Sequence, residues 1–295
     1  MVKRNIAFRI VLFFTPYLLF SGASSEQAFS TTVVVSILPQ AWFIEQIAGD
    51  SVKTQVLIGP GQSPHTYELS PHQLAGLSKA SFWLLSGAEF ELSLVPKVRQ
   101  LFPKLLIVDG TQGVQLRLLE AHDGDSHAAI EYDRHTWLGR EPAKIMVAHI
   151  RDAFSSICRE RQKVYHDACA KILTQIDAAF DRLQTDLKPL YGQTVFVYHP
   201  SFGYFLDEFG IKQEAVETGG KEPSARQLRS LIEHAKSAGA ATIFVQAQFP
   251  VNSAQTVAQA TGAQLIPLDP LAPDWLDNIE RIGRALKHSI ADRQK

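Results

Sequence analysis

The segment from Pro142 to Leu187 constrains the fold most, because its apolar residues recur at the three- and four-residue spacing of an amphipathic helix. It is roughly 45 residues long and would extend about 65–70 Å as one straight helix. Its early proline suits a first helical turn, and the charged run 159–163 is where a break is expected. A compact protein uses such a helix best as a linker between two lobes. A coiled coil is the alternative, although the segment lacks a sustained heptad repeat.

Strand and helix patterns alternate on both sides of this segment. Short apolar strands are predicted at 32–37, 52–58, 82–86, 105–109, 194–198, 213–216, 241–245 and 264–268. Helices between or after them are predicted at 42–48, 73–80, 202–209, 224–238, 253–261 and 275–288. This alternation predicts parallel sheets covered by helices. We therefore expect an α/β protein in which two lobes, at 30–140 and 191–295, are joined by a long linker helix region at 141–190.

Residues 1–23 have the pattern of a cleaved export signal. Three basic residues precede the apolar run Ile10–Phe20, and small residues follow at 21–23. The run is too short to span a membrane, which takes about 20 helical residues. We expect a signal peptide at 1–23 and a periplasmic mature chain, with no cysteine near the cleavage site to carry a lipid. A buried N-terminal helix is the alternative.

Charge and cysteine content narrow the function. A formal net charge of -1 argues against a nucleic-acid partner. Cys158 and Cys169 lack the spacing of a zinc or redox motif. On one continuous helix their Cα atoms would lie about 16 Å apart, beyond the roughly 4.4–6.8 Å of a disulfide, although a break could bring them closer. We expect two unpaired, packed thiols.

Candidate ligands follow the predicted strands, where open α/β sheets bind their ligands. His65 lies in a loop rich in glycine and proline after one strand, and His199 and Asp269 each follow another. A fourth candidate, His135, lies just before the linker helix. Alone, each of these residues also fits an ordinary loop or turn. Together, three imidazoles and a carboxylate from both halves predict a site for a divalent transition metal.

Two other histidines, His122 and His127, lie in an acidic stretch between Glu120 and Glu131. We expect a solvated loop there, and weak, transient metal capture is the alternative. The sequence has no glycine-rich phosphate loop, no Gly-x-Ser-x-Gly elbow and no His-Glu-x-x-His helix. None of the enzyme classes marked by these motifs is therefore indicated.

Five segments carry recognisable motifs: Val33–Pro39, Pro64–Glu68, His135–Leu138, His199–Phe205 and Gly220–Ser224. In type and order they resemble the metal-binding solute-binding proteins of ABC importers, the zinc and manganese receptors with a rigid helical linker. The resemblance implies two α/β lobes joined by one long helix, with the metal held between them. It also implies a non-enzymatic receptor that captures zinc outside the cytoplasm and delivers it to an inner-membrane ABC permease. We expect a monomer.

Matched residue by residue, the family's three histidines fall on His65, His135 and His199, and its carboxylate falls on Asp269. Manganese-selective members carry a glutamate where this chain has His199. An imidazole suits zinc better than manganese, and zinc outranks manganese at most nitrogen and oxygen sites. We expect Zn²⁺ as the transported ligand, with Asp269 contacting it directly or through water. A manganese or broad divalent-metal receptor is the alternative.

The chain departs from the family pattern in three places. Arg134 replaces the proline of an Asp-Pro-His motif and places a cation beside a proposed ligand. Gln246-Ala-Gln-Phe249 stands where zinc receptors often have Glu-Pro-Gln-Phe, and the histidine-rich loop is reduced to His122 and His127. These departures bear on metal preference more than on metal binding.

Two other classes of function remain as alternatives. Three histidines with an open position also form catalytic zinc sites, so a zinc-dependent hydrolase is an alternative, although no motif places a glutamate base beside the ligands. A receptor for a non-metal solute, or a surface adhesin on the same fold, is a third possibility.

Overall fold

The computed structural model of the chain describes residues 31–119, 131–216, 224–249 and 252–293. The predicted signal peptide at 1–23 and the stretch that holds His122 and His127 lie outside these residues. In the described part of the chain, no helix is both long and apolar enough to cross a membrane.

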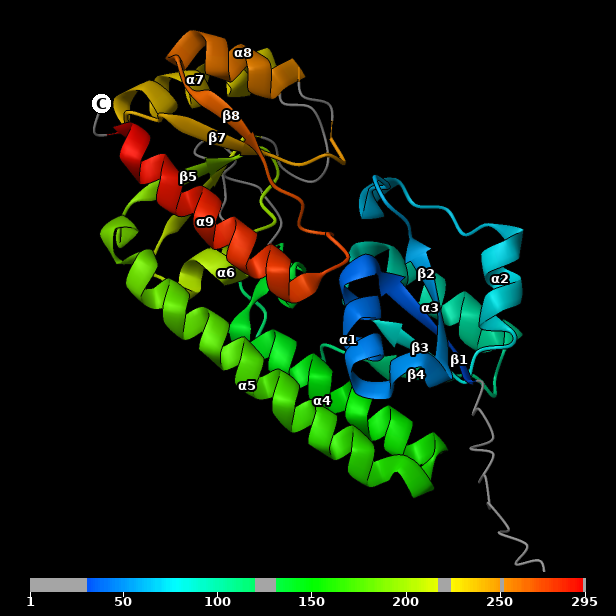
Figure 1. Cartoon of the computed structure of the whole chain (residues 1–295). Helices are drawn as coiled ribbons and strands as arrows, with labels where there is room; N and C mark the ends of the chain where they lie inside the picture. Colours follow the sequence, from blue (N-terminus) through cyan, green and yellow to red (C-terminus); the bar gives the residue numbers. More distant parts are fainter. Residues whose placement is uncertain (1–30, 120–130, 217–223, 250–251, 294–295) are drawn as a thin grey trace, which may run out of the picture.

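The N-terminal lobe is a parallel sheet of strand order β2-β1-β3-β4 covered by helices (Figure 1). Its strands are β1 (Thr31–Ile37), β2 (Val52–Ile58), β3 (Phe82–Leu85) and β4 (Leu106–Asp109). Its helices are α1 (Leu38–Ala48), α2 (Pro71–Leu77) and α3 (Glu89–Leu101). The sequence patterns missed α3, whose fully buried side chains are Glu91 and Val98, and whose apolar side chains Phe90, Leu94 and Val95 are only partly buried.

The C-terminal lobe repeats this architecture with strand order β6-β5-β7-β8, again all parallel. Its strands are β5 (Thr194–Val197), β6 (Lys212–Ala215), β7 (Thr242–Val245) and β8 (Gln264–Pro267). Its helices are α6 (Gly203–Glu208), α7 (Ala225–Ser237) and α8 (Asn252–Thr261). The predicted fold class, two lobes with parallel, helix-covered sheets, is confirmed.

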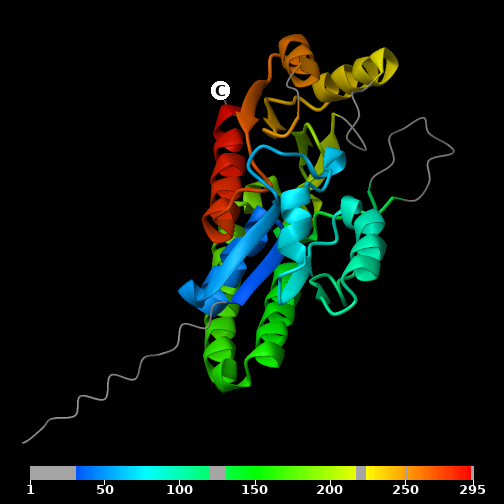
Figure 2. The same ribbon diagram turned by 90° about the vertical axis from the view of Figure 1, so that its right-hand side faces the viewer.

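The linker is two helices, α4 (Arg140–Ile157) and α5 (Gln162–Asp186). The break falls at Cys158, whose φ of -144° and ψ of 86° are not helical, and a short 3₁₀ turn, Arg159–Arg161, follows. Helix α5 then runs back beside α4, and the turn lies at the end of the molecule away from α7 and α8 (Figure 2). The break expected near the charged run 159–163 is present, because this run offers no apolar side chain to continue the buried face. The linker therefore does not have the roughly 65–70 Å length of one straight helix.

Cys158 lies at this break, and Cys169 lies within α5. Cys158 and Cys169 are unpaired, 7% and 2% exposed respectively, and belong to the main apolar core. The expectation of packed thiols is confirmed.

One apolar core runs through both lobes and the linker. It contains Val35 of β1, Phe154 of α4, Phe180 of α5 and Val197 of β5. Helix α9 (Trp275–Arg293) packs along α5 and also contacts α1 of the other lobe (Figure 1). The lobes are therefore held together by buried apolar surface as well as by the chain connection.

Candidate metal centre

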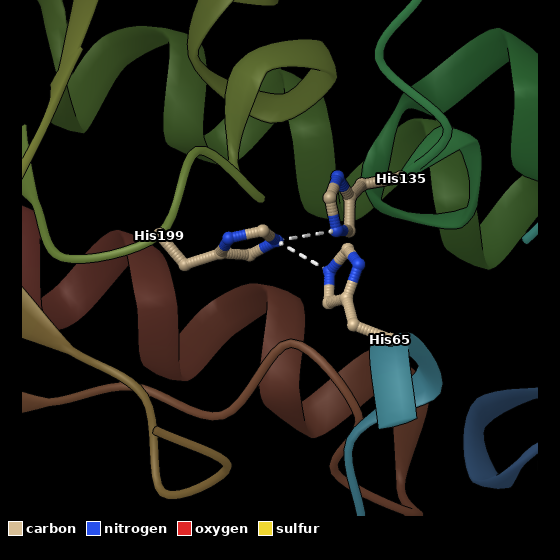
Figure 3. A group of neighbouring side chains, drawn as sticks. All are labelled: His65, His135 and His199. Carbon is tan, nitrogen blue, oxygen red and sulfur yellow. Dashed lines mark hydrogen bonds between the residues drawn. The ribbon is translucent and has the colours of Figure 1, made fainter. Parts of the chain in front are cut away.

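Three of the four sequence-predicted residues, His65, His135 and His199, point toward one another between the lobes (Figure 3). One possible ligand atom from each residue lies within 4.8 Å of those of the other two. The Nε2 atom of His199 is 3.2 Å from the Nε2 atoms of both His65 and His135. Two imidazoles come from the N-terminal lobe and one from the C-terminal lobe.

These nitrogen separations fit a single small metal ion. Zinc binds imidazole nitrogen at about 2.0–2.1 Å with tetrahedral angles, which places two such nitrogens about 3.3–3.4 Å apart. The two separations of 3.2 Å are close to that value. Two of the three nitrogen pairs therefore have nearly the spacing that a tetrahedral ion needs, and all three ligand atoms lie within 4.8 Å of one another.

Local backbone structure explains how His65 is presented. It is the middle residue of the 3₁₀ turn Pro64–Thr66 beyond the carboxyl end of β2. The proline fixes the start of the turn, and Ser63 Oγ accepts a hydrogen bond of 3.3 Å from the His65 backbone N–H. On the far side of the ring, Nδ1 lies 3.7 Å from a carboxylate oxygen of Glu89, in the first turn of α3. Nε2 is thus left to face the other imidazoles.

His135 is held by a carboxylate two residues earlier. Asp133 Oδ1 accepts hydrogen bonds from the His135 backbone N–H at 2.9 Å and from its Nδ1 at 2.8 Å. The Asp133 side chain is fully buried, so these bonds are not exposed to solvent. A proton on Nδ1 leaves Nε2 with a free lone pair, the form that binds a metal.

His199 is held through its backbone and its ring face. The carboxamide of Gln246 accepts a 3.0 Å bond from the His199 N–H and donates a 2.9 Å bond to the His199 carbonyl, much as a neighbouring strand would. The ring of Phe249 stacks on the imidazole, with centroids 4.5 Å apart. The sequence alone indicated no such role for Gln246 or Phe249, which lie in the Gln246-Ala-Gln-Phe249 segment that departs from the family pattern.

Burial and mutual repulsion keep two of the imidazoles neutral. His199 is 3% exposed, and its burial, together with the nearby His135 and His65, lowers its pKa well below the ordinary 6.5. Burial is also the main cause of the lowered pKa of His65, with a further contribution from His135 and opposition from Glu89. Neutral imidazoles at pH 7 offer their lone pairs to a cation without first losing a proton.

These pKa shifts predict how the stability of the metal-free protein depends on pH. An unfolded histidine takes up a proton near pH 6.5, whereas folded His199 and His65 resist protonation until their lower pKa values. The stabilisation is complete above about pH 6.5 and is lost as the pH falls toward the folded values, by at most ~1.4 kcal/mol per pH unit per group. Urea unfolding at pH 7.5 and 5.5 should show this loss. His199→Ala should reduce the pH dependence, and an equally steep profile in that variant would contradict the assignment.

Asp269 lies apart from the three imidazoles. Among the described residues, the group of close ligand atoms contains no carboxylate. Asp269 Oδ1 instead accepts hydrogen bonds from Gln248 Nε2 at 2.7 Å and from the Leu271 N–H at 2.8 Å. In the described part of the chain, the other carboxylate oxygen, Oδ2, has no hydrogen-bond donor.

The cation beside His135 is engaged elsewhere. Arg134 Nη1 donates a 3.3 Å hydrogen bond to the carbonyl of Gly87, in the turn before α3. The contacts of Asp133, Glu89 and Gln246 were not anticipated as site features. Of these, only Asp133 carried a local signal, since an aspartate two residues before a histidine can bond back to it.

Comparison with known proteins also identifies relatives that are named for zinc uptake or zinc binding. Residues 33–289 match the family described as "Zinc-uptake complex component A periplasmic". The high-affinity zinc uptake system protein ZnuA of Yersinia pestis is 28% identical over 265 residues, which cover 82% of this chain and 83% of the relative. The zinc-binding lipoprotein AdcA of Streptococcus pneumoniae is 26% identical over 81% of this chain, which spans about half (50%) of AdcA.

Solved structures agree in fold. A crystal structure of ZnuA superimposes with a TM-score of 0.82 at 32% identity, over 88% of this chain and 99% of that chain. The periplasmic zinc-binding protein TroA of Treponema pallidum superimposes with a TM-score of 0.79 over 88% of this chain and 99% of TroA, and its 17% identity speaks for the fold alone.

Proposed function

The chain belongs to the ZnuA family of periplasmic zinc-uptake components, and from that premise we propose that it captures zinc outside the cytoplasm and delivers it to an ABC-type permease. The observation that carries the proposal is the meeting of three imidazoles, two from one lobe and one from the other. The two nitrogen separations across the lobes, 3.2 Å each, are close to those around a tetrahedral ion. The relatives named for zinc binding or zinc uptake support it.

His65, His135 and His199 are the proposed ligands, each through Nε2. The fourth position is assigned to Asp269 or to a water that it holds, because Asp269 Oδ2 has no hydrogen-bond donor among the described residues. Because the ligands come from both lobes, the ion would stabilise one relative placement of the lobes. The lobes are proposed to comprise residues 30–140 and 191–295 of a monomer, with 141–190 as the linker.

We expect a small movement on binding, because the lobes are already fastened near the ligands. Trp137, two residues after His135, donates its indole N–H to the carbonyl of Pro270 at 2.8 Å. Pro270 directly follows Asp269, so the two ligand-bearing segments are joined across the lobes before any ion binds. Shifts of loops or side chains are favoured over a wide hinge motion.

A receptor role without turnover is part of the proposal. The carboxylates that contact the imidazoles, Glu89 and Asp133, both meet ring Nδ1 atoms, on the far side from the Nε2 meeting point. From there they orient the rings, which is a positioning role and not that of a general base.

Zinc should be preferred over manganese. Three nitrogen donors suit zinc, whereas manganese prefers oxygen donors in larger coordination shells. The purified mature chain, stripped and reloaded, should hold one zinc per molecule, measured by elemental analysis. A hundredfold excess of Mn²⁺ should leave that zinc in place. Displacement by manganese would contradict the zinc assignment, and no metal uptake at all would contradict the proposed function.

A further inference from the structure

We infer that Arg117 is a positioning residue that ties His135 to helix α6 of the opposite lobe, so that one guanidinium links zinc binding to the seating of the two lobes. The inference rests on the proposed function, because it treats His135 as a zinc ligand. It concerns a side chain far from any ligand in the sequence.

On the N-terminal side, Arg117 holds the carboxylate that orients His135. Asp133 Oδ2 accepts a 3.0 Å hydrogen bond from Arg117 Nη1, while Asp133 Oδ1 accepts from the His135 ring. The Asp133 side chain is 0% exposed, and a buried carboxylate with no cation beside it is strongly destabilised. Arg117 is therefore the cation that pairs with this buried carboxylate and fixes it in the orientation that turns Oδ1 toward the His135 ring.

On the C-terminal side, the same guanidinium binds a second carboxylate. Arg117 Nε and Nη2 donate to the two carboxylate oxygens of Asp207, on α6, at 2.8 Å and 3.3 Å. Helix α6 begins four residues after His199. One planar cation thus spans two carboxylates from different lobes, an arrangement that the single ammonium of lysine cannot reproduce.

Two residues of α6, Gly203 and Tyr204, lie directly against the Arg117–Asp133 ion pair. The hydroxyl of Tyr204 accepts a 3.1 Å bond from the Arg117 N–H and donates a 3.1 Å bond to the Asp133 carbonyl. A Cβ atom added to Gly203 would lie 1.9 Å from Arg117 Nη1 and 2.6 Å from Asp133 Oδ2. The first turn of α6 therefore rests directly on the pair, and only glycine permits that approach.

A hydrogen-bonded chain results, from His135 through Asp133 and Arg117 to Asp207. At its N-terminal end lies a proposed ligand, and at its C-terminal end lies the helix that follows another, His199. Loss of Arg117 would free the His135 ring to rotate and would remove a fixed contact between the lobes.

The test compares Arg117→Ala, Arg117→Lys and Asp207→Asn by zinc competition with a chromophoric chelator. We expect Arg117→Ala to weaken zinc binding about 10- to 100-fold, the usual effect of losing a group that orients a metal ligand. Arg117→Lys should recover only part of this loss. Asp207→Asn should weaken binding as well, and should add little in the Arg117→Ala background, because both changes break one chain of contacts.

A spectroscopic readout separates positioning from general destabilisation. Long-range ¹H–¹⁵N spectra of the metal-free protein should show the His135 proton fixed on Nδ1 in the unaltered chain and exchanging between the two ring nitrogens in Arg117→Ala. Arg140→Ala is the matched control, since Arg140 also pairs with a carboxylate of α6, Glu208, at 3.5 Å. It should affect unfolding but leave zinc affinity within about twofold, since it orients no ligand.

Zinc affinity of Arg117→Ala within twofold of the unaltered chain, or an equal loss in Arg140→Ala, would overturn the inference while the proposed function stands. If Arg117→Ala does not fold, Arg117→Lys and Asp207→Asn decide by the same criterion. Failure of the unaltered chain to bind zinc would overturn the proposed function and the inference together.

Discussion

Replacing His199 by alanine should weaken zinc binding by at least about 100-fold, since losing only an orienting partner of a metal ligand already costs ~10–100-fold. His199 is the shared member of the cluster, because its Nε2 lies 3.2 Å from the Nε2 atoms of both His65 and His135. It is also the only one of the three from the C-terminal lobe. Its loss would leave Asp269, or the water that it holds, as the sole proposed ligand from the C-terminal lobe. Chelator competition at pH 7.5 measures the effect.

Two further variants make this result specific. His65→Ala should weaken binding to a similar degree and removes a side chain that is 21% exposed, so its effect on folding is smaller. His166→Ala removes an exposed imidazole of α5 and should leave the affinity unchanged. Unchanged affinity in His199→Ala or His65→Ala would rule out the proposed ligand set.

Among the substitutions proposed here, replacing Trp275 by alanine should cause the largest loss of folding stability. The side chain is 1% exposed, packs at 4.9 Å from the ring of Phe43 in the other lobe, and donates its indole N–H to the Trp137 carbonyl at 2.6 Å. Trp275→Ala should lower the free energy of unfolding by about 3–5 kcal/mol through the cavity it creates. Trp275→Phe keeps most of the packing and leaves a buried carbonyl unpaired, for a loss of about 1–3 kcal/mol.

Urea unfolding followed by circular dichroism measures both variants. A single transition is expected, because one apolar core includes residues of both lobes and of the linker. Separate transitions for the two lobes, or a loss below about 1 kcal/mol in Trp275→Ala, would contradict the view that the lobes are fastened by buried contacts.

Sequence patterns predicted the elements that bury an apolar face. Strand β1 was predictable because its β-branched residues are buried on both sides of the sheet. Helix α3 was not, because it is mostly exposed and carries Pro96. At Cys158 the break in the linker helix was predicted, but the reversal of chain direction was not. The charged run indicated a break, but the direction that the chain takes afterwards depends on packing between α4 and α5.

The same limit applies to the candidate site. The positions of His65 and His199 marked them as candidate ligands, because each lies beyond the carboxyl end of a strand, where open α/β sheets bind their ligands. The two strands belong to different sheets, so the meeting of the side chains depends on how the two lobes pack. Asp269 also follows a strand, yet it lies outside the imidazole group. The link from Arg117 to Asp207 joins residues 90 positions apart. No local sequence pattern predicts such a pair, because the two side chains come together only when the two lobes pack against each other.

X-ray absorption at the zinc edge, on the purified chain loaded with one equivalent of zinc, tests whether His65, His135 and His199 bind zinc together. We expect four light-atom neighbours near ~2.0–2.1 Å, with the outer-shell scattering of three imidazole rings, falling to two rings in His199→Ala. A spectrum with sulfur neighbours, with no imidazole scattering, or with no change in His199→Ala would contradict it.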